Sequence, residues 1–316
     1  MSAADAIMAL DPAFWRATLG GALRLATPIV FAAIGETVVE RSGTLNLGVD
    51  GMMTAGAFAA VVGASFAGWP FGLALAAGAG LSLGLAMGAA VLRGEANQIV
   101  VGIAIALVSV GLTDYAFQLW QPSGAAMAFV PLAPSVAIPL LSAIPFVGDV
   151  VFAQSVLTDA AVLLLAAVLL ALRFTRLGLT IKAAGDDPAA AALRGVAVAR
   201  VRWLALGFGG LTAGLGGAAI TIGFLGAYSD GVTAGRGYIA IAVVIIGRWS
   251  PFGAVLGALL FAFFESLSLR LQGHAGAWPS EAYAILPYAT TLIVLFATAR
   301  ARAAPRALGA PLRRGE

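Results

Sequence analysis

The chain has 316 residues, of which 61% are apolar and only 10% are charged, and its mean hydropathy is +0.98. A soluble domain carries about 25% charged residues, and one soluble core does not hide this much apolar side chain. The composition therefore argues against a water-soluble enzyme and predicts a protein whose solvent is lipid. Cysteine is absent and there is one histidine, which excludes disulfides, thiolate metal sites and histidine clusters.

Nine apolar segments follow one another along the chain, and we interpret each as a membrane-spanning helix. Spanning strands would show short alternating segments, which these are not, and isolated strands leave their backbone unsatisfied in lipid. The expected spans are residues 17–35, 49–67, 71–92, 98–120, 155–172, 203–225, 237–248, 252–270 and 283–299. The predicted fold class is an all-α polytopic membrane protein with about nine (eight to ten) helices in one domain, residues 1–316.

Arginine and lysine set the expected orientation, because cytoplasmic loops carry an excess of them. Segment 173–202 and the tail 300–316 hold eleven of the 18 basic residues. Four spans separate these two stretches, so both fit on the cytoplasmic side, the first as a large loop and the second as a basic tail. The same count places Arg41, Arg93 and Arg248 inside.

The N-terminus then falls outside, which puts Arg16 and Arg24 outside or within the first span. A short interfacial helix near residues 11–15, or an extra re-entrant segment, would remove this conflict. Residues 121–154 form the longest outer connection and contain five prolines, which argue against another regular span. We expect a folded external loop there, with a short helix.

An internal echo suggests a repeat. The run Trp69–Leu75 resembles Ser250–Leu256, and each follows an apolar segment that starts with glycine. The expected topology places Pro70 outside and Pro251 inside, so the two halves would have inverted orientation, as in many transporters.

The segment 35–53 is polar and rich in glycine where the chain enters the second span. Its glycines permit an unwound backbone, which lipid-embedded proteins tolerate only where it faces protein or a water-filled cavity. Asn46 and Asp50 would then offer hydrogen bonds toward a central path. A plain cytoplasmic turn with solvated Glu36, Glu40 and Arg41 is the alternative interpretation.

The predicted inner loop contains a short helix with clear boundaries. Asp187 suits an N-cap and Pro188 suits the first helical position, alanines follow, and Gly195 ends the helix. A capped connector is one interpretation, and a helix that docks into a groove of a partner is the other. The chain has no phosphate-binding loop, since Ala183 follows its one lysine, Lys182, so the energy for any work comes from an ion gradient or a partner ATPase.

Three segments of the sequence resemble one family of membrane proteins. The run Gly35–Met53 is similar to the permease subunits of bacterial ATP-binding-cassette (ABC) importers, in the simple-sugar and nucleoside branch related to ribose and branched-chain amino-acid permeases. The nucleoside-type pattern usually has Glu where this chain has Asp50. Residues 185–196 resemble that family's cytoplasmic loop, residues 97–104 resemble another family segment, and the likeness covers roughly residues 20–300.

The resemblance implies a type II importer-like permease in a bacterial inner membrane. Its expected partners are a second homologous permease, an ATP-binding subunit that carries ATP and Mg²⁺, and an external solute-binding protein, with lipid around it and no nucleic acid. The implied coupling residues are Gly185, Asp186, Asp187, Pro188, Ala191, Arg194 and Gly195. This chain itself is expected to hold no cofactor or metal and to catalyse no reaction.

The solute path is expected to pass polar side chains within the apolar spans. The candidates are Asn46, Asp50, Asn97, Gln98 and Asp114. Glu265 is a further intramembrane acid, interpreted mainly as pairing with a neighbouring helix or reaching toward the outer interface. A link between Asp50 and Arg236 is a further hypothesis. A nucleoside or simple sugar is the expected solute, a branched-chain amino acid is an alternative, and an ion-coupled transporter that needs no ATPase is a second class.

Overall fold

The computed structural model describes residues 11–121, 127–137, 142, 144, 146–272, 279–298 and 304–310. Within these residues, seven helices are long and apolar enough to cross a membrane. They are α2 (Pro12–Arg41), α3 (Val49–Ala67), α4 (Trp69–Gly88) continued by the π-helix η1 (Ala89–Arg93), α5 (Gln98–Trp120), α7 (Val156–Phe174), α10 (Val198–Ile220) continued by η2 (Thr221–Leu225), and α12 (Pro251–Gln272).

Two further apolar helices are shorter, α11 (Arg236–Ile246) and α14 (Leu286–Thr298). Together with the seven they match the nine predicted segments, so the all-α polytopic fold class is confirmed. Of the two features suggested to resolve the N-terminal conflict, a separate short helix near residues 11–15 is not found, because α2 is one continuous helix of 30 residues from Pro12. Its start is set by Asp11, whose side chain accepts a hydrogen bond from Ala13 N at 2.8 Å, and by Pro12 in the first turn.

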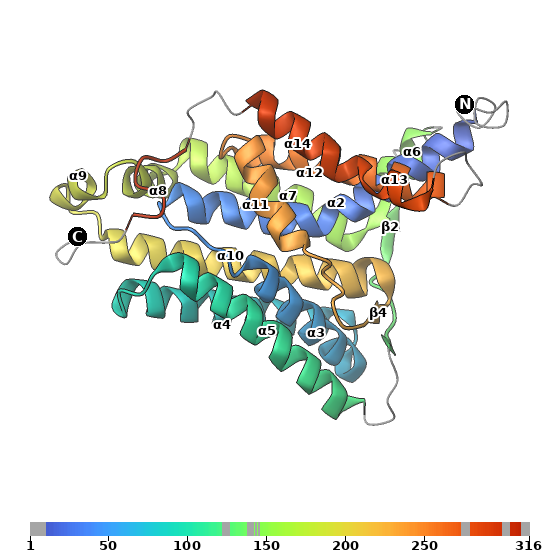
Figure 1. The fold of residues 1–316 in the computed structure, drawn as a ribbon, viewed down its shortest axis with the longest axis horizontal. Coiled ribbons are helices and arrows are strands. Elements are labelled where there is room, and N and C mark those ends of the chain that lie inside the picture. Colours follow the sequence, from blue (N-terminus) through green and yellow to red (C-terminus); the bar gives the residue numbers. More distant parts are fainter. Residues whose placement is uncertain are drawn as a thin grey trace.

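The two halves of the chain are interleaved. Helix α10 packs against α2, α3 and α4, while α2 packs against α10, α11 and α12. Each half therefore packs a long helix against helices of the other half, while the inverted repeat itself stays a prediction. Figure 1 shows α2 and α10 side by side through the length of the bundle.

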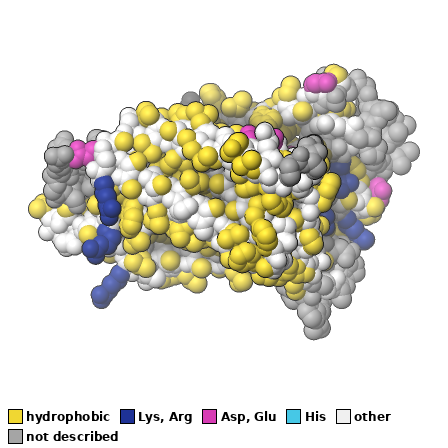
Figure 2. Space-filling view, turned by 90° about the horizontal axis from the view of Figure 1, so that it is seen from below, with side chains coloured by type: hydrophobic (Ala, Val, Ile, Leu, Met, Phe, Trp, Pro, Cys, Tyr) yellow, Lys and Arg dark blue, Asp and Glu magenta, His cyan; other side chains and the backbone are white. Residues whose placement is uncertain are grey.

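The two ends of the bundle differ. One end carries the short helices α8 (Arg176–Asp186) and α9 (Pro188–Leu193) beside the C-terminal segment, within the predicted cytoplasmic stretches 173–202 and 300–316 (Figure 1). The opposite end carries α6 (Val147–Val151), α13 (Ser280–Ala284) and two small antiparallel sheets. Figure 2 shows hydrophobic side chains over the long face between the ends, with Lys and Arg gathered toward the ends.

The predicted external loop 121–154 contains the expected short helix, α6, but also strands that the sequence did not predict. Strand β1 (Ala128–Phe129) pairs with β4 (Ala227–Tyr228), with Ala128 opposite Tyr228. Strand β2 (Ser135–Ala137) pairs with β3 (Ala153–Ser155), with Val136 opposite Gln154. Residues 122–126, 138–141, 143 and 145 of this loop, and 300–303 and 311–316 of the tail, lie outside the described residues.

The contact between α4 and α10 depends on the absence of side chains. A Cβ atom on Gly80 would lie 2.1 Å from the carbonyl oxygen of Gly210, whereas one on Gly78 would meet nothing within 4 Å. Small residues allow helix backbones to approach this closely in lipid, where helices associate through close packing.

We therefore predict that Gly80→Leu destabilises the bundle by about 2 kcal/mol or more through overpacking, while Gly78→Leu changes stability little. Thermal unfolding in detergent, followed by loss of the monodisperse peak, measures both. Equal melting temperatures for the two variants would contradict the close contact.

Candidate functional site

Helices α3 and α11 begin next to each other inside the bundle. The carboxylate of Asp50, in the first turn of α3, accepts a hydrogen bond from the backbone N of Gly237 in the first turn of α11, at 2.9 Å. A Cβ atom on Gly237 would lie 2.4 Å from the Cα of Asp50, so only glycine allows this approach. We call this contact the Asp50 joint.

The joint lies at membrane depth. Helix α11 has 11 residues, so it is about 16 Å long, roughly half the thickness of the hydrocarbon core. It ends close to Trp249, whose backbone oxygen accepts a hydrogen bond from Arg41 Nε at 2.7 Å, at the end of α2. The first turn of α11 therefore lies within the depth of the bundle, as Figure 1 also shows.

Hydrogen-bond donors face the buried carboxylate of Asp50. The first backbone N–H groups of a helix lack intrahelical partners and carry partial positive charge, and Asp50 stands at two such helix starts. No side chain of α11 caps its own first turn, so the carboxylate of Asp50 provides that cap from another helix. Thr233 adds a contact, since its hydroxyl donates to Asp50 Oδ2 at 3.5 Å.

An ion pair lies beside the joint. Arg236 donates from Nη2 to Glu265 Oε1 of α12 at 2.8 Å, the one ion pair found within the described part of the chain. This confirms the interpretation of Glu265 as the partner of a neighbouring helix. Arg236 directly precedes Gly237, whose N–H binds Asp50, so Arg236 lies next to Asp50 as hypothesised. Its guanidinium pairs with Glu265 and not with Asp50.

The unwound segment between α2 and α3 is also present. Asn46 is buried, donates to Glu36 Oε2 at 3.1 Å and accepts from Gly48 N at 3.1 Å. The interpretation of Glu36 and Glu40 as solvated charges is wrong, because their exposed fractions are 1% and 2%. Their partners come from elsewhere: Asn46 binds Glu36, and the indole N–H of Trp249 donates to Glu40 Oε2.

Asn97 and Gln98 are not assembled with Asp50. Asn97 is the N-cap of α5 and accepts from Ile99 N at 2.9 Å. Gln98 accepts from Leu45 N at 2.8 Å and donates to Ala310 O at 3.3 Å, which ties α5 to the unwound segment and to the C-terminal segment. Both side chains therefore hydrogen-bond to backbone groups at the end of the bundle that carries α9.

Asp114 lies toward the opposite end, on α5. It faces a different set of groups, Tyr228 and Asp230, rather than the Asp50 joint. Burial raises the pKa of the Tyr228 hydroxyl to about 12, so this hydroxyl stays neutral and offers hydrogen bonds beside two carboxylates. The five predicted path residues are therefore spread along the length of the bundle.

Most of the predicted coupling residues are exposed at the other end of the bundle, although Gly185 and Ala191 are buried. Asp187 caps α9 by accepting from Ala190 N at 2.9 Å, as predicted, and Gly195 follows with a φ of +83°. Ala191 is buried against Ala184 of α8 and Val198 of α10, while Leu193 is 91% exposed. The helix thus rests on one small apolar contact and presents the rest of its surface.

Hydrogen bonds hold the C-terminal turn of α8, which we call its base. Gly185 O accepts from Ala307 N at 2.9 Å. The guanidinium of Arg202, 1% exposed, donates to Ser42 O and Ala310 O, each at 3.1 Å. The end of α2, the base of α8, the start of α10 and the segment 304–310 therefore meet in one cluster, which we call the Arg202 cluster.

Sequence reasoning missed Arg202 and Trp249 as organising residues. Arg202 was counted among the basic residues of a loop, although it lies in the first turns of α10 and is fully buried. Trp249 lies in the turn before α12, and its contact with Glu40 spans 209 positions. Within the described residues, no group of three acidic or histidine side chains lies together as metal ligands would.

The fold and these contacts define a multi-pass membrane transport protein. Residues 18–295 match the family described as branched-chain amino acid transport system / permease component, and the chain belongs to this family of ABC transporter permeases. The match covers most of the sequence, which confirms the resemblance seen in its motifs.

Curated relatives agree. The chain is 31% identical to a putative glucose ABC transporter permease of Haloferax volcanii, over 80% of this chain and 77% of that protein. It is 31% identical to a nucleoside ABC transporter permease of Lactococcus lactis (90% and 92%) and 31% identical to a guanosine ABC transporter permease of Bacillus subtilis (92% and 94%). No solved structure matches the chain.

We predict that Trp249→Phe destabilises the fold by about 2 kcal/mol, because it leaves the buried Glu40 carboxylate without its indole donor. Trp203→Phe is the matched control, since Trp203 donates to the backbone oxygen of Leu85 at 3.3 Å in a half-buried setting, and we expect a loss of about 1 kcal/mol or less. Thermal unfolding of the two purified variants compares them. A larger loss at Trp203 would show that the Glu40 contact contributes little.

Proposed function

We propose that this permease imports a nucleoside or a simple sugar, driven by ATP that a separate cassette subunit hydrolyses. The observation that carries the proposal is that α9 is capped and exposed, so a partner protein can bind it. The chain has no phosphate-binding loop of its own, so that partner would supply the ATP site. The names of three relatives, which concern glucose, nucleosides and guanosine, support the solute class over a branched-chain amino acid.

The proposed complex contains a second related permease, the ATP-binding subunits with their Mg²⁺ and an external solute-binding protein. We assign α9 and the C-terminus to the cytoplasmic side of a bacterial plasma membrane, because eleven of the 18 basic residues lie in 173–202 and 300–316. In this complex the exposed side chain of Leu193 enters an apolar groove of the ATP-binding subunit, with the exposed Asp186, Asp187 and Arg194 at its edge.

A continuous series of contacts links α9 to the Asp50 joint. Movement of α9 carries α8, whose base is bonded into the Arg202 cluster with the end of α2. The end of α2 holds the turn at Trp249 through Glu40 and Arg41. That turn follows α11 directly, and α11 starts at Asp50. Docking at one end thereby biases the inner helices between two arrangements, which is what alternating access requires.

We propose that Asp50 and Asn46 are the deepest residues of the solute path. Their oxygens and amide suit a solute rich in hydroxyl and N–H groups, because each hydrogen bond that the solute loses with water needs a replacement inside the membrane. Asn97 and Gln98 contribute to the same route as anchors of the unwound segment. Asp114 stands closer to the predicted outer mouth.

We predict that Leu193→Ser reduces ATP-driven uptake at least ten-fold while leaving the thermal stability of the isolated chain unchanged, since this side chain is 91% exposed. Replacing Asp187 and Pro188 by glycine removes the cap of α9 and should uncouple ATP hydrolysis from uptake. Arg176→Gln, an exposed change on α8, is the control. Wild-type uptake by both α9 variants would sink the assignment of α9 as the docking helix.

Reconstituted uptake tests the function directly. Proteoliposomes that hold the complete complex should accumulate guanosine or glucose only with internal ATP and the binding protein. Uptake by this chain alone, driven by a sodium or proton gradient, would instead identify a secondary transporter that uses Asp50, Asp114 or Glu265. Uptake of leucine in place of both solutes would overturn the solute class and keep the ATP-driven permease.

A further inference from the structure

Two acidic side chains, Glu36 and Glu40, are buried one helical turn apart near the end of α2. Residues four positions apart lie on the same face of a helix, so the two carboxyl groups share one side of α2. Each acid is therefore a charged neighbour of the other, and their like charges repel. Acidic side chains are almost never fully buried unless they are paired with a cation. We call these two residues the Glu36–Glu40 pair.

Within the described part of the chain, neither acid forms an ion pair, because the one ion pair found there joins Arg236 to Glu265. The cations closest in the chain and in the cluster have other partners. Arg41 donates to the backbone oxygen of Trp249, and its charged neighbour is Asp186.

Charged groups on the other helices packed against α2 are also engaged elsewhere. Arg202 of α10 donates to the backbone oxygens of Ser42 and Ala310. Asp50 of α3 accepts from Gly237, and the Arg236–Glu265 ion pair joins α11 to α12. A buried carboxylate without a cation costs several kcal/mol, so two such carboxylates side by side need another form of compensation.

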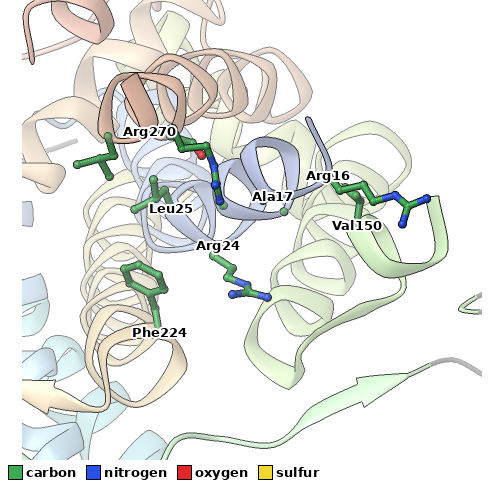
Figure 3. A pocket seen from close by; sticks show the side chains of 11 residues that line it. Arg16, Ala17, Arg24, Leu25, Val150, Phe224 and Arg270 are labelled. Atoms are coloured by element: carbon green, nitrogen blue, oxygen red, sulfur yellow. The ribbon is translucent and has the colours of Figure 1, made fainter. Parts of the chain in front are cut away.

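Charges nearer the other end of α2 are in a different setting. Arg16 and Arg24 are exposed and line a pocket of about 370 Å³ together with Arg270 of α12 (Figure 3). Arg24 is 12 residues from Glu36 along the helix, which is about 18 Å. These arginines are therefore too distant to form an ion pair with either acid.

The hydrogen bonds of the two acids are unequal. Glu40 Oε2 accepts from the indole N–H of Trp249. Glu36 Oε2 accepts from the side-chain amide of Asn46 at 3.1 Å, while Glu36 Oε1 is buried without a partner. No such oxygen is found on Glu40 among the described side chains. A carboxylate accepts up to about four hydrogen bonds, so Glu36 is the acid whose negative charge the fold compensates least.

We propose that Glu36 is a proton-binding site, which holds one proton in the folded chain while Glu40 stays ionised. The carboxylate of Glu36 takes this proton from water as the chain folds, and an O–H bond is the one bond formed. The pair then carries one negative charge in place of two, and the donor from Trp249 serves the acid that keeps it. The proposal depends neither on the solute nor on the ATP-binding partner.

Infrared spectroscopy of the full-length protein in lipid nanodiscs tests this site. At about pH 7 the wild type should show the C=O stretch of a protonated carboxyl group, and this band should shift in heavy water. Glu36→Gln, the neutral isostere, should lose the band. Glu40→Gln should keep it, and so should Glu265→Gln, the control from the Arg236 ion pair. Asn46→Ala removes the amide that donates to Glu36 and should shift the frequency of the same band.

Thermal unfolding gives a second, independent measurement. Stability falls with rising pH wherever the folded state binds more protons than the unfolded state. The melting temperature of the wild type should therefore fall more steeply with rising pH than that of Glu36→Gln, in which this group no longer titrates. Equal slopes for the two proteins would contradict the proposal.

Three spectroscopic results would also overturn it. A band that Glu40→Gln removes and Glu36→Gln keeps would assign the proton to the other acid. A band that survives in both variants would belong to a different acid, such as Asp114. A band that appears only after sodium is replaced by choline would show that a monovalent cation occupies the Glu36–Glu40 pair in place of a proton.

Discussion

The structure depends on one constraint: a helix that begins inside a membrane must find partners for its first backbone N–H groups. Helix α11 begins at that depth, and the carboxylate of Asp50 accepts the N–H of Gly237. Asp50 itself stands in the first turn of α3, so its side chain joins the starts of two helices. Glycine at 237 is what lets the two backbones approach this closely.

The joint is one of the places where the interleaved halves meet. Since α3 belongs to the first half and α11 to the second, their meeting point fixes the halves against each other in the interior. A second fixed point lies at the end that carries α9, where Glu40 and Arg41 hold the turn at Trp249. Helix α11 connects these two points. A displacement at the α9 end therefore has a mechanical route to Asp50.

Local signals in the sequence predicted much of this fold. The apolar segments gave all nine apolar helices to within a few residues, with α2 as the main exception, and the Asp187–Pro188 pattern gave the cap and start of α9. The resemblance in residues 35–53 and 185–196 identified the permease family. Each of these signals is local, because it depends only on residues that are close together in the sequence.

The candidate site was less predictable, because its bonds join distant segments. Glu36 and Glu40 look like solvated charges until Asn46 and Trp249 are known to meet them. Asn97 and Gln98 look like path residues, but their neighbours Ile99, Leu45 and Ala310 use them as backbone anchors. Arg202 looks like one more basic loop residue, and only the folded arrangement of Ser42 and Ala310 shows why it is buried.

The Asp50 joint is the central claim, and backbone hydrogen exchange measures it most directly. In the full complex in lipid nanodiscs, a peptide that covers residues 233–238 should exchange slowly, because the N–H of Gly237 is bonded to Asp50. Asp50→Ala should speed exchange in this peptide and leave α4 and α7 unchanged, whereas Asp114→Ala should have no effect there. Equal exchange in the wild type and in Asp50→Ala would contradict the account.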